Sequence, residues 1–304
     1  MLVILIHFGD IMISIITASY NYENYIKQTI DSIISQSYPD WELIVVDDGS
    51  KDNSLEVIKS YCEKDSRIKL FTHENNQNLG LCETLKLGIS KCSGVYIAFL
   101  ESDDLWEKDC LLHKVEAISQ NPNAAILVND VELIGDKDFV NQYVERQKEY
   151  FISQNNLFSA PSFDIKEFMK NNYFPTFSCV TVKKFCIENA KFNSPSKPNL
   201  DWYLWIQILK MTDEIVFIPY KDTLWRIHEG SYISSRKKSD YALFFKKMHN
   251  ILFKQDLPRI LFRISEFFHK QNVQKKMRPM IFSFDRFLVD KHPHPIKVKR
   301  YVKE

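Results

Sequence analysis

Glycine is scarce in this sequence, and the glycine-rich motifs of two large classes of nucleotide-binding proteins are missing. Only 7 of the 304 residues are Gly. No G-x-G-x-x-G follows the first predicted strand, which excludes the dinucleotide fingerprint, and no G-x-x-x-x-G-K-[ST] occurs, which excludes a P-loop. A phosphate group, if one is bound, must therefore be neutralised by other means.

The sequence also lacks cysteine pairs and long apolar runs. None of the 6 cysteines stands in a C-x-x-C pair or at a zinc-ligand spacing, so we expect reduced thiols, which favours the cytoplasm. The apolar start MLVILIHF is far shorter than the roughly 20 residues of a membrane span. It also lacks the basic start and the cleavage site of a signal peptide. We expect residues 1–11 to be an extension outside the core fold.

Net charge is almost absent as well. The chain holds 40 Lys and Arg against 39 Asp and Glu, a formal net charge of +1, which argues against a nucleic-acid partner. Residues 235–304, however, contain 18 basic and 6 acidic residues. Apolar residues at helical spacing lie among them, so we expect a basic helical C-terminal region. It would either make peripheral contact with the inner face of the cytoplasmic membrane or pack on the rest of the chain with a solvated basic face.

Strand and helix patterns alternate four times in the first third of the chain. Apolar, β-branched runs predict four strands, at residues 12–21, 41–50, 67–74 and 95–100. Apolar residues at three- and four-residue steps predict the intervening helices. The alternation is typical of an α/β fold with a Rossmann-like, mostly parallel central sheet flanked by helices. After about residue 110 it weakens, and residues 141–175 show no clear pattern.

Three of the four predicted strands end in polar clusters, with the sequences SYNYEN, DDGSKD and ESDD. Ligands of such sheets bind beyond the carboxyl ends of the strands. A surface turn explains one acidic cluster, but two acid pairs at one edge would repel each other unless a cation lay between them. Oxygen ligands at this density suit Mg²⁺ or Mn²⁺. We therefore predict a divalent ion, held by Asp103 and Asp104, that bridges to a diphosphate.

Six segments of the chain resemble family 2 glycosyltransferases with the GT-A fold, and they occur in the same order. They are SIITASYNYENYI, ELIVVDDGSKDNS, NLGLCETLKLGI, GVYIAFLESDD, LDWYLW and WRIHEGSYISS. The resemblance implies a glycosyltransferase domain over residues 12–234, with a nucleotide-binding half to about residue 110 and an acceptor-binding half from about residue 111. It implies an inverting enzyme that moves a hexosyl or N-acetylhexosaminyl group from a nucleotide diphosphate sugar, with UDP expected, to an acceptor hydroxyl.

The resemblance also implies roles for individual residues at the sheet edge. Ala18 and Tyr20 would border the nucleobase, and Asp48 would accept a hydrogen bond from it. Asp103 and Asp104 would match the metal-binding acidic motif, Asp104 most directly, with Asp103 also near the nucleotide. As simpler alternatives, Tyr20 would only cap the sheet, and Asp47 and Asp48 before Gly49 would be plain turn formers.

Further roles fall later in the chain. Asp201 would match the catalytic base and His228 a histidine that faces the metal or the diphosphate. The alternatives are a helix N-cap for Asp201 and a packed histidine. The sequence departs from the family pattern at three places. Glu101 occupies a position that is often Asp, so its direct metal role is in doubt, and Leu200 replaces an acid before the base. In the third predicted helix Leu85-Lys86 replaces Arg-Asn, and Lys86 would face a phosphate instead, with a solvent-facing lysine as the alternative.

Two other functions stay open at this point. A nucleotidyltransferase would also bind a metal-linked nucleotide, but the usual glycine-rich start with a basic residue is missing after the first strand. A non-catalytic nucleotide-sugar-binding protein is the other, and Leu200 favours it slightly. The abundant Lys, Asn, Ile and Phe suggest an AT-rich bacterial genome, and bacterial enzymes of this type commonly build surface polysaccharides. We therefore expect a glycan or glycolipid acceptor.

Overall fold

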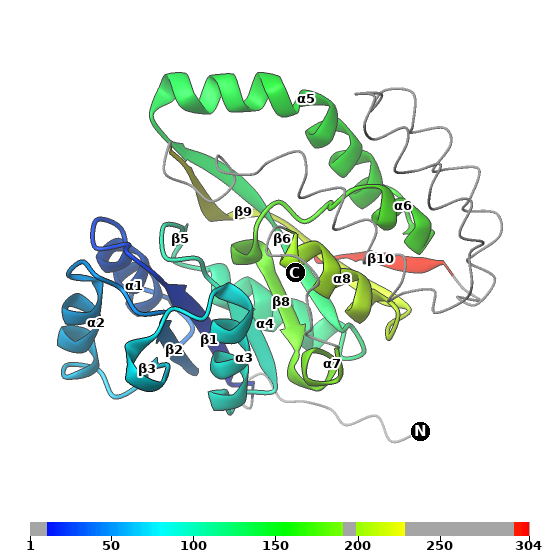
Figure 1. Cartoon of the computed structure of the whole chain (residues 1–304). Coiled ribbons are helices and arrows are strands. Elements are labelled where there is room, and N and C mark those ends of the chain that lie inside the picture. Colours follow the sequence, from blue (N-terminus) through cyan, green and yellow to red (C-terminus); the bar gives the residue numbers. More distant parts are fainter. Residues whose placement is uncertain (1–10, 191–198, 229–294, 304) are drawn as a thin grey trace, which may run out of the picture.

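The computed structural model describes three stretches of the chain, residues 11–190, 199–228 and 295–303 (Figure 1). The predicted N-terminal extension, apart from its last residue, lies outside the described residues, as do residues 235–294 of the predicted basic helical region. Ile11 belongs to the core. Its side chain is buried, and its carbonyl accepts a hydrogen bond from the Tyr38 hydroxyl at 2.7 Å.

Four parallel strands form the first half of the sheet, as the sequence predicts. They are β1 (Ile13–Ser19), β2 (Trp41–Asp47), β3 (Ile68–Thr72) and β4 (Tyr96–Phe99). The helices between them are α1 (Ile26–Ile34), α2 (Ser54–Cys62) and α3 (Leu81–Lys91), with a short 3₁₀ helix, η2 (Glu74–Asn76). β1 pairs in parallel with both β2 and β4, and β3 flanks β2. The predicted α/β fold is confirmed.

Side chains of β1 alternate between two hydrophobic cores, one on each face of the sheet. Ile13 and Ile15 pack in the core that includes α1, α2 and α4 (Cys110–Gln120). Ile16 packs in the other core, with α3 and α8 (Leu200–Leu209). Because both faces are covered, the central strands have apolar side chains on both faces and not only at every second residue.

The second half of the sheet mixes parallel and antiparallel strands. Its members are β5 (Leu105–Trp106), β6 (Ile126–Gly135), β7 (Ser162–Phe163), β8 (Val180–Lys183), β9 (Glu214–Ile227) and β10 (Ile296–Arg300). The strand order is β3-β2-β1-β4-β8-β6-β9-β10-β7, with β5 paired to β9. β8 is antiparallel to both β4 and β6, so it joins the two halves. The pairing of β5 with β9 brings the late part of β9 beside the acidic cluster that precedes β5.

The second half also contains a long helix that the sequence pattern does not predict. α5 (Lys137–Ser159) has 23 residues and lies along the upper side of the molecule in Figure 1. Its buried residues, Gln154, Leu157 and Phe158, lie near its C-terminal end, so most of the helix has no continuous apolar stripe. The shorter helices are α6 (Ile165–Lys170), α7 (Lys184–Asn189) and the 3₁₀ helix η3 (Phe177–Cys179). Over the described stretches, no helix has the length and apolar character needed to cross a membrane.

The end of the chain differs from the helical region that we predict from its sequence. Residues 296–300 form strand β10, which lies parallel to β9 and antiparallel to β7. The sequence IKVKR alternates with a period of two: Ile296 is fully buried and Val298 half-buried, whereas Lys297 and Lys299 are exposed. This alternation is typical of a strand near the edge of a sheet with one covered face. It decides the secondary structure of this segment, whereas the basic composition does not.

Candidate active site

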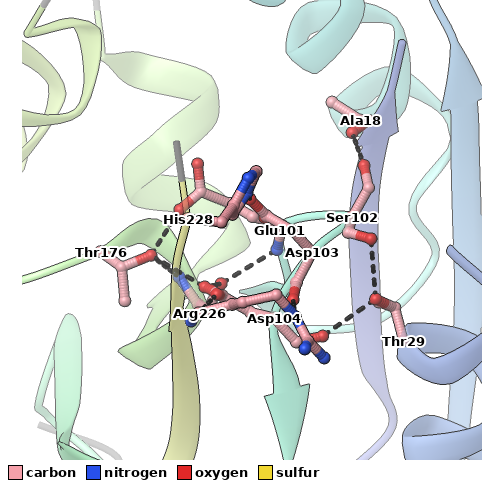
Figure 2. A network of polar contacts seen from close by, with 10 residues as sticks. Ala18, Thr29, Glu101, Ser102, Asp103, Asp104, Thr176, Arg226 and His228 are labelled. Carbon is pink, nitrogen blue, oxygen red and sulfur yellow. Dashed lines mark hydrogen bonds and ion pairs between the residues drawn. The ribbon is translucent and has the colours of Figure 1, made fainter. Parts of the chain in front are cut away.

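The acidic cluster Glu101-Ser102-Asp103-Asp104 lies at the carboxyl end of β4, and Figure 2 shows it enclosed by polar partners from several elements. Its turn is fixed from the side of β1 and α1. The Ser102 hydroxyl donates to the Ala18 carbonyl at 2.5 Å, and the Thr29 hydroxyl donates to the carbonyls of Ser102 and Asp104, both at 2.9 Å. The backbone that carries the acids is therefore anchored to β1 and α1.

Asp104 is the inward-facing acid of the cluster and is completely buried. Its Oδ1 accepts a hydrogen bond from the Arg226 amide at 2.9 Å, and its Oδ2 accepts from the hydroxyls of Ser178 at 2.6 Å and Thr176 at 3.3 Å. Burial, and then the charges of Asp103 and Glu101, raise the pKa of Asp104 well above its usual range. This carboxyl group connects β4 to β9 and η3.

Asp103 is the outward-facing acid. Its Oδ2 lies 3.0 Å from His228 Nε2, and the two side chains are 13% and 18% exposed. The Tyr22 hydroxyl also hydrogen-bonds Asp103; burial, and then the charge of Asp103, raise the pKa of Tyr22 above its usual range. The ring of Tyr25 lies 5.0 Å from the His228 ring. Asp103 and His228 thus form a partly open acid and imidazole pair that two tyrosines contact.

Glu101 points to a partner on η3. Its Oε2 accepts a hydrogen bond from the Thr176 hydroxyl, and its amide donates to Ser178 Oγ at 2.9 Å. The extra methylene of Glu, compared with Asp, gives the carboxylate the reach for this bond. Glu101 therefore links the acidic cluster to the segment before β8.

Arg226 is a site residue that the sequence analysis does not single out. Its Nε donates to the Asp103 carbonyl at 2.8 Å and its Nη2 to Gln28 Oε1 at 2.8 Å, while the guanidinium lies 5.1 Å from the Tyr25 ring. A signal was available, because Arg226 stands two residues before His228 at the end of β9 and so points to the same face of the strand. Thr176 and Ser178, by contrast, lie in a region without a recognisable motif.

The residues expected to contact the nucleotide lie at the ends of β1 and β2. The Asp48 amide donates to the Ser19 carbonyl at 2.8 Å, which places the two strand ends side by side. The Asp48 carboxylate accepts hydrogen bonds from the amides of Leu79 at 2.8 Å and Gly80 at 2.9 Å. It therefore attaches the start of α3 to the end of β2. Tyr20 is 43% exposed at the same edge.

The neighbouring Asp47 and Gly49 form the turn after β2. Asp47 Oδ1 accepts from the amides of Gly49 at 3.1 Å and Ser50 at 2.9 Å, in the manner of an ordinary turn-forming aspartate. Gly49 has φ +79°, and a Cβ added there would lie 2.5 Å from the Asn76 carbonyl oxygen. A side chain at this position is therefore excluded both by the backbone conformation and by space.

Asp201 and Lys86 have different surroundings. α8 begins at Leu200 and its N-cap is Asn199, so Asp201 lies inside the first turn and is not the N-cap. Asp201 Oδ2 accepts a hydrogen bond from Asn172 Nδ2 at 2.8 Å. Leu200 is buried in the core, which accounts for an apolar residue before Asp201. Lys86 pairs with Glu83 at 2.8 Å on α3 and does not join the acidic cluster.

The structure thus brings Asp103, Asp104 and His228 together, with Asp48 and Tyr20 at the adjoining strand ends. Across the described residues, no three or more His, Cys, Asp or Glu side chains are already arranged as a complete metal site. What the geometry offers is one partly open carboxylate and one imidazole, with a buried carboxyl group behind them.

Comparison with known proteins gives a consistent result. The family model "Glycosyl transferase family 2" matches residues 14–179. A curated relative from Escherichia coli, the UDP-Glc:alpha-D-GlcNAc-diphosphoundecaprenol beta-1,3-glucosyltransferase WfgD, is 33% identical over 201 residues, covering 66% of this chain and 71% of the relative. Two further relatives, from Bacillus subtilis and Haemophilus influenzae, are matched over only 41% and 43% of their length.

Solved structures agree on the fold. Staphylococcus aureus TarS 1-349 in complex with UDP-GlcNAc matches with a TM-score of 0.62 at 18% identity, covering 81% of this chain and 68% of that one. The mannosyltransferase PcManGT from Pyrobaculum calidifontis, in complex with GDP-Man and Mn²⁺, matches with a TM-score of 0.58 at 16% identity, covering 84% and 68%. The family match decides against a nucleotidyltransferase. The chain belongs to glycosyl transferase family 2 and is a glycosyltransferase with the GT-A fold.

Proposed function

We propose that this glycosyltransferase is an inverting enzyme that transfers a sugar from a nucleoside diphosphate sugar, with uridine expected as the base, to an acceptor hydroxyl. The observation that carries the proposal is the Asp103 and His228 pair at 3.0 Å, partly open to solvent at the carboxyl edge of the sheet. Two solved proteins of this fold were captured with UDP-GlcNAc and GDP-Man, which supports a donor of this class.

We assign Ala18, Tyr20 and Asp48 to the nucleotide. They lie at the adjoining ends of β1 and β2, which the hydrogen bond from the Asp48 amide to the Ser19 carbonyl holds together. The ring of Tyr20 is exposed enough to pack against a base. Lys86 is left out of this assignment because its ammonium group already pairs with Glu83.

We assign a Mg²⁺ or Mn²⁺ ion to Asp103 and His228. A carboxylate oxygen and an imidazole nitrogen suit such an ion, with Mn²⁺ favoured by the nitrogen ligand, and diphosphate oxygens and water would complete its coordination. When bound, the ion neutralises charge on the leaving diphosphate. We expect Asp104 to support the site without contacting the ion directly. Its carboxylate oxygens already accept hydrogen bonds from Ser178, Thr176 and the Arg226 amide. This revises the expectation that Asp104 is the more direct ligand.

Asp201 is the general base in this proposal. Its carboxylate takes the proton of the acceptor hydroxyl while the acceptor oxygen forms a bond to the anomeric carbon. The bond from that carbon to the diphosphate oxygen breaks, and its electron pair leaves with the nucleoside diphosphate. A single displacement of this kind inverts the anomeric centre. Proton removal by a positioned carboxylate contributes roughly 10² to 10⁴ in rate.

The acceptor that we propose is a lipid-linked glycan in bacterial surface polysaccharide synthesis. The E. coli relative is named for a GlcNAc-diphosphoundecaprenol acceptor, and the chain covers 71% of that protein. With such an acceptor we expect the reaction at the inner face of the cytoplasmic membrane and the enzyme in the cytoplasm, and the 18 basic residues among positions 235–304 favour contact with anionic lipid headgroups.

Asp201→Asn tests the catalytic part of the proposal. Release of UDP from a panel of UDP-sugars, with Mn²⁺ present and water as acceptor, measures turnover, and calorimetry measures UDP affinity. We expect turnover to fall by about 10²-fold or more with UDP affinity unchanged. Asp213→Asn, an exposed aspartate beyond α8, is the matched control. Wild-type turnover in Asp201→Asn would remove Asp201 from the role of base.

A further inference from the structure

One short segment touches both the acidic cluster and the proposed base. This bridging segment, residues 172–178, runs from the end of α6 into η3. At its start, Asn172 Nδ2 donates to Asp201 Oδ2 at 2.8 Å. At its end, Ser178 Oγ donates to Asp104 Oδ2 at 2.6 Å, and Thr176 Oγ1 donates to Glu101 and to Asp104. The base and the acidic cluster therefore both contact one segment of seven consecutive residues.

The orientation of the Asn172 amide follows from its two hydrogen bonds. Its Oδ1 accepts from the Phe174 amide at 3.2 Å, and a backbone N–H can only donate. The NH₂ group must then face Asp201, and both of its hydrogens are donors. The contact at 2.8 Å is thus an amide donor on a carboxylate, which fixes the rotation of that carboxylate about its last bond.

The bridging segment is held rigidly on both sides. Gln154 of α5 donates from Nε2 to the Tyr173 carbonyl at 2.8 Å. The ring of Phe174 stacks on Phe158 of α5, with centroids 6.1 Å apart and planes at 12°, and also meets Trp205 of α8 at 5.9 Å. Because α5 and α8 both contact it, the bridging segment keeps its position without a bound substrate.

We propose that Asn172 is a positioning residue for the general base: its amide orients the Asp201 carboxylate, and the bridging segment keeps that carboxylate in register with the acidic cluster. The inference rests on the proposed function, because it assumes that Asp201 takes the proton of the acceptor. Asn172 itself needs no contact with the sugar or the diphosphate in this role.

Tyr150 of α5 is a titratable group that interacts electrostatically with Asp201. Burial is the main cause that raises the pKa of Tyr150 well above its usual range, with smaller contributions from Cys179, Tyr143 and Asp201. The Tyr150 hydroxyl therefore stays protonated across the pH range in which a carboxylate base titrates. A pH effect of changes at Asn172 should accordingly report on the carboxylate.

Asn172→Asp gives the sharpest test. The new side chain keeps the acceptor for the Phe174 amide but places a second carboxylate against Asp201, and two carboxylates in contact hold one proton to higher pH. The acidic limb of the kcat profile for UDP release should move up by about one pH unit or more. At pH values below the wild-type limb, turnover should fall by up to about tenfold, and it should recover as the pH is raised. UDP affinity should stay unchanged.

Two further variants separate positioning from structural support. Asn172→Ala should lower kcat by about tenfold even on the plateau above the acidic limb, and should move the limb up by less than Asn172→Asp does, because it removes one donor and adds no charge. Asn189→Asp makes the same chemical change at the exposed end of α7 and should leave the profile as in the wild type. A role in stability alone would lower the folded fraction of Asn172→Asp, measured by circular dichroism, and leave its acidic limb in place. That result would overturn the proposal.

Asp201→Asn shows whether a failure concerns the base assignment or only the role of Asn172. If Asp201→Asn retains turnover, the assignment of the base fails and the role of Asn172 falls with it. If Asp201→Asn is inactive and Asn172→Asp keeps the wild-type acidic limb, the base stands and only the role of Asn172 is refuted.

Discussion

Acidic residues at the two ends of the central sheet have opposite surroundings. At the amino end, Glu42 is buried and receives hydrogen bonds from the hydroxyls of Ser14 and Ser93, the Ser93 amide and the Lys69 ammonium, at 2.6 to 2.8 Å. At the carboxyl end, Asp103 and Asp104 crowd together with a third acid. Burial alone would raise the pKa of Glu42, but the bonds from Lys69, Ser93 and Ser14 lower it to about 2.

The difference shows how hydrogen-bond donors affect the pKa of a buried carboxylate. Glu42 has a donor for each of its oxygens, including a cation, so its charged form is stabilised and it holds β1, β2 and β3 together. Asp104 also has donors, yet the neighbouring acids and complete burial keep its pKa well above the usual range. A carboxylate of the first kind supports the fold, whereas a cluster of the second kind gains most from a bound cation.

The largest effect in this comparison is expected for Asp103→Asn. The change removes the partly open carboxylate of the proposed cation site, so UDP release with Mn²⁺ should fall by about 10³-fold. The free energy of unfolding should change by less than about 1 kcal/mol, because relief of repulsion with Asp104 offsets the lost contact with His228. Turnover and urea unfolding are measured on the same preparation. A stability loss as large as that of a core mutation would contradict the assignment.

The next effect is stabilisation by ligands. Mn²⁺ together with UDP at about 100 times their Kd should stabilise the wild type by about 2.7 kcal/mol, seen as a rise in Tm. Asp103→Asn should lose the part that depends on Mn²⁺, whereas Glu42→Gln should keep all of it because Glu42 lies at the other end of the sheet. Equal stabilisation of both variants would place the ion elsewhere.

The distinction between Asp103 and Asp104 also marks where sequence reasoning ends. The two acids are neighbours in the chain, and their order predicts a cluster but not which side chain turns inward. That choice depends on the hydroxyls of Thr176 and Ser178 and on the Arg226 amide, which are remote in sequence. The position of the acidic cluster at the end of β4 could be predicted, because apolar runs define the parallel strands. Thr176 and Ser178, which hydrogen-bond the cluster, lie in a segment without a recognisable sequence pattern.

The same reasoning applies to the fold. The four parallel strands follow from continuous apolar runs, and these are confirmed. α5 escapes prediction because its buried residues cluster near one end, and its cap at Asp136, which accepts from the amides of Asp138 and Phe139, is a local signal without an apolar stripe behind it. Asn172 is likewise invisible in the sequence, since its importance comes from a contact with a helix 29 residues later.

Glu42→Gln should have a smaller effect, on stability and its pH dependence. The folded pKa of Glu42 is lowered to about 2, so its contribution is present above the ordinary value of 4.5 and is lost as the pH falls toward 2. It is of the order of 2 kcal/mol, because the half-exposed Lys69 is partly screened. Urea unfolding at several pH values should show wild type and variant converging near pH 2. Glu56→Gln, in an exposed pair with Lys59, should leave the wild-type curve unchanged.

The smallest effect is expected for Glu101→Asp, which restores the residue that is frequent in the family at this position. Shortening the side chain removes its reach to the Thr176 hydroxyl, so the free energy of unfolding should fall by about 1 kcal/mol. Mn²⁺-dependent UDP binding should change by less than about threefold, because Glu101 serves as a link to η3 and not as a metal ligand in our assignment. Tighter Mn²⁺ binding by tenfold in Glu101→Asp would show instead that an aspartate here joins Asp103 on the ion, and that this chain carries a weakened version of the family's cation site.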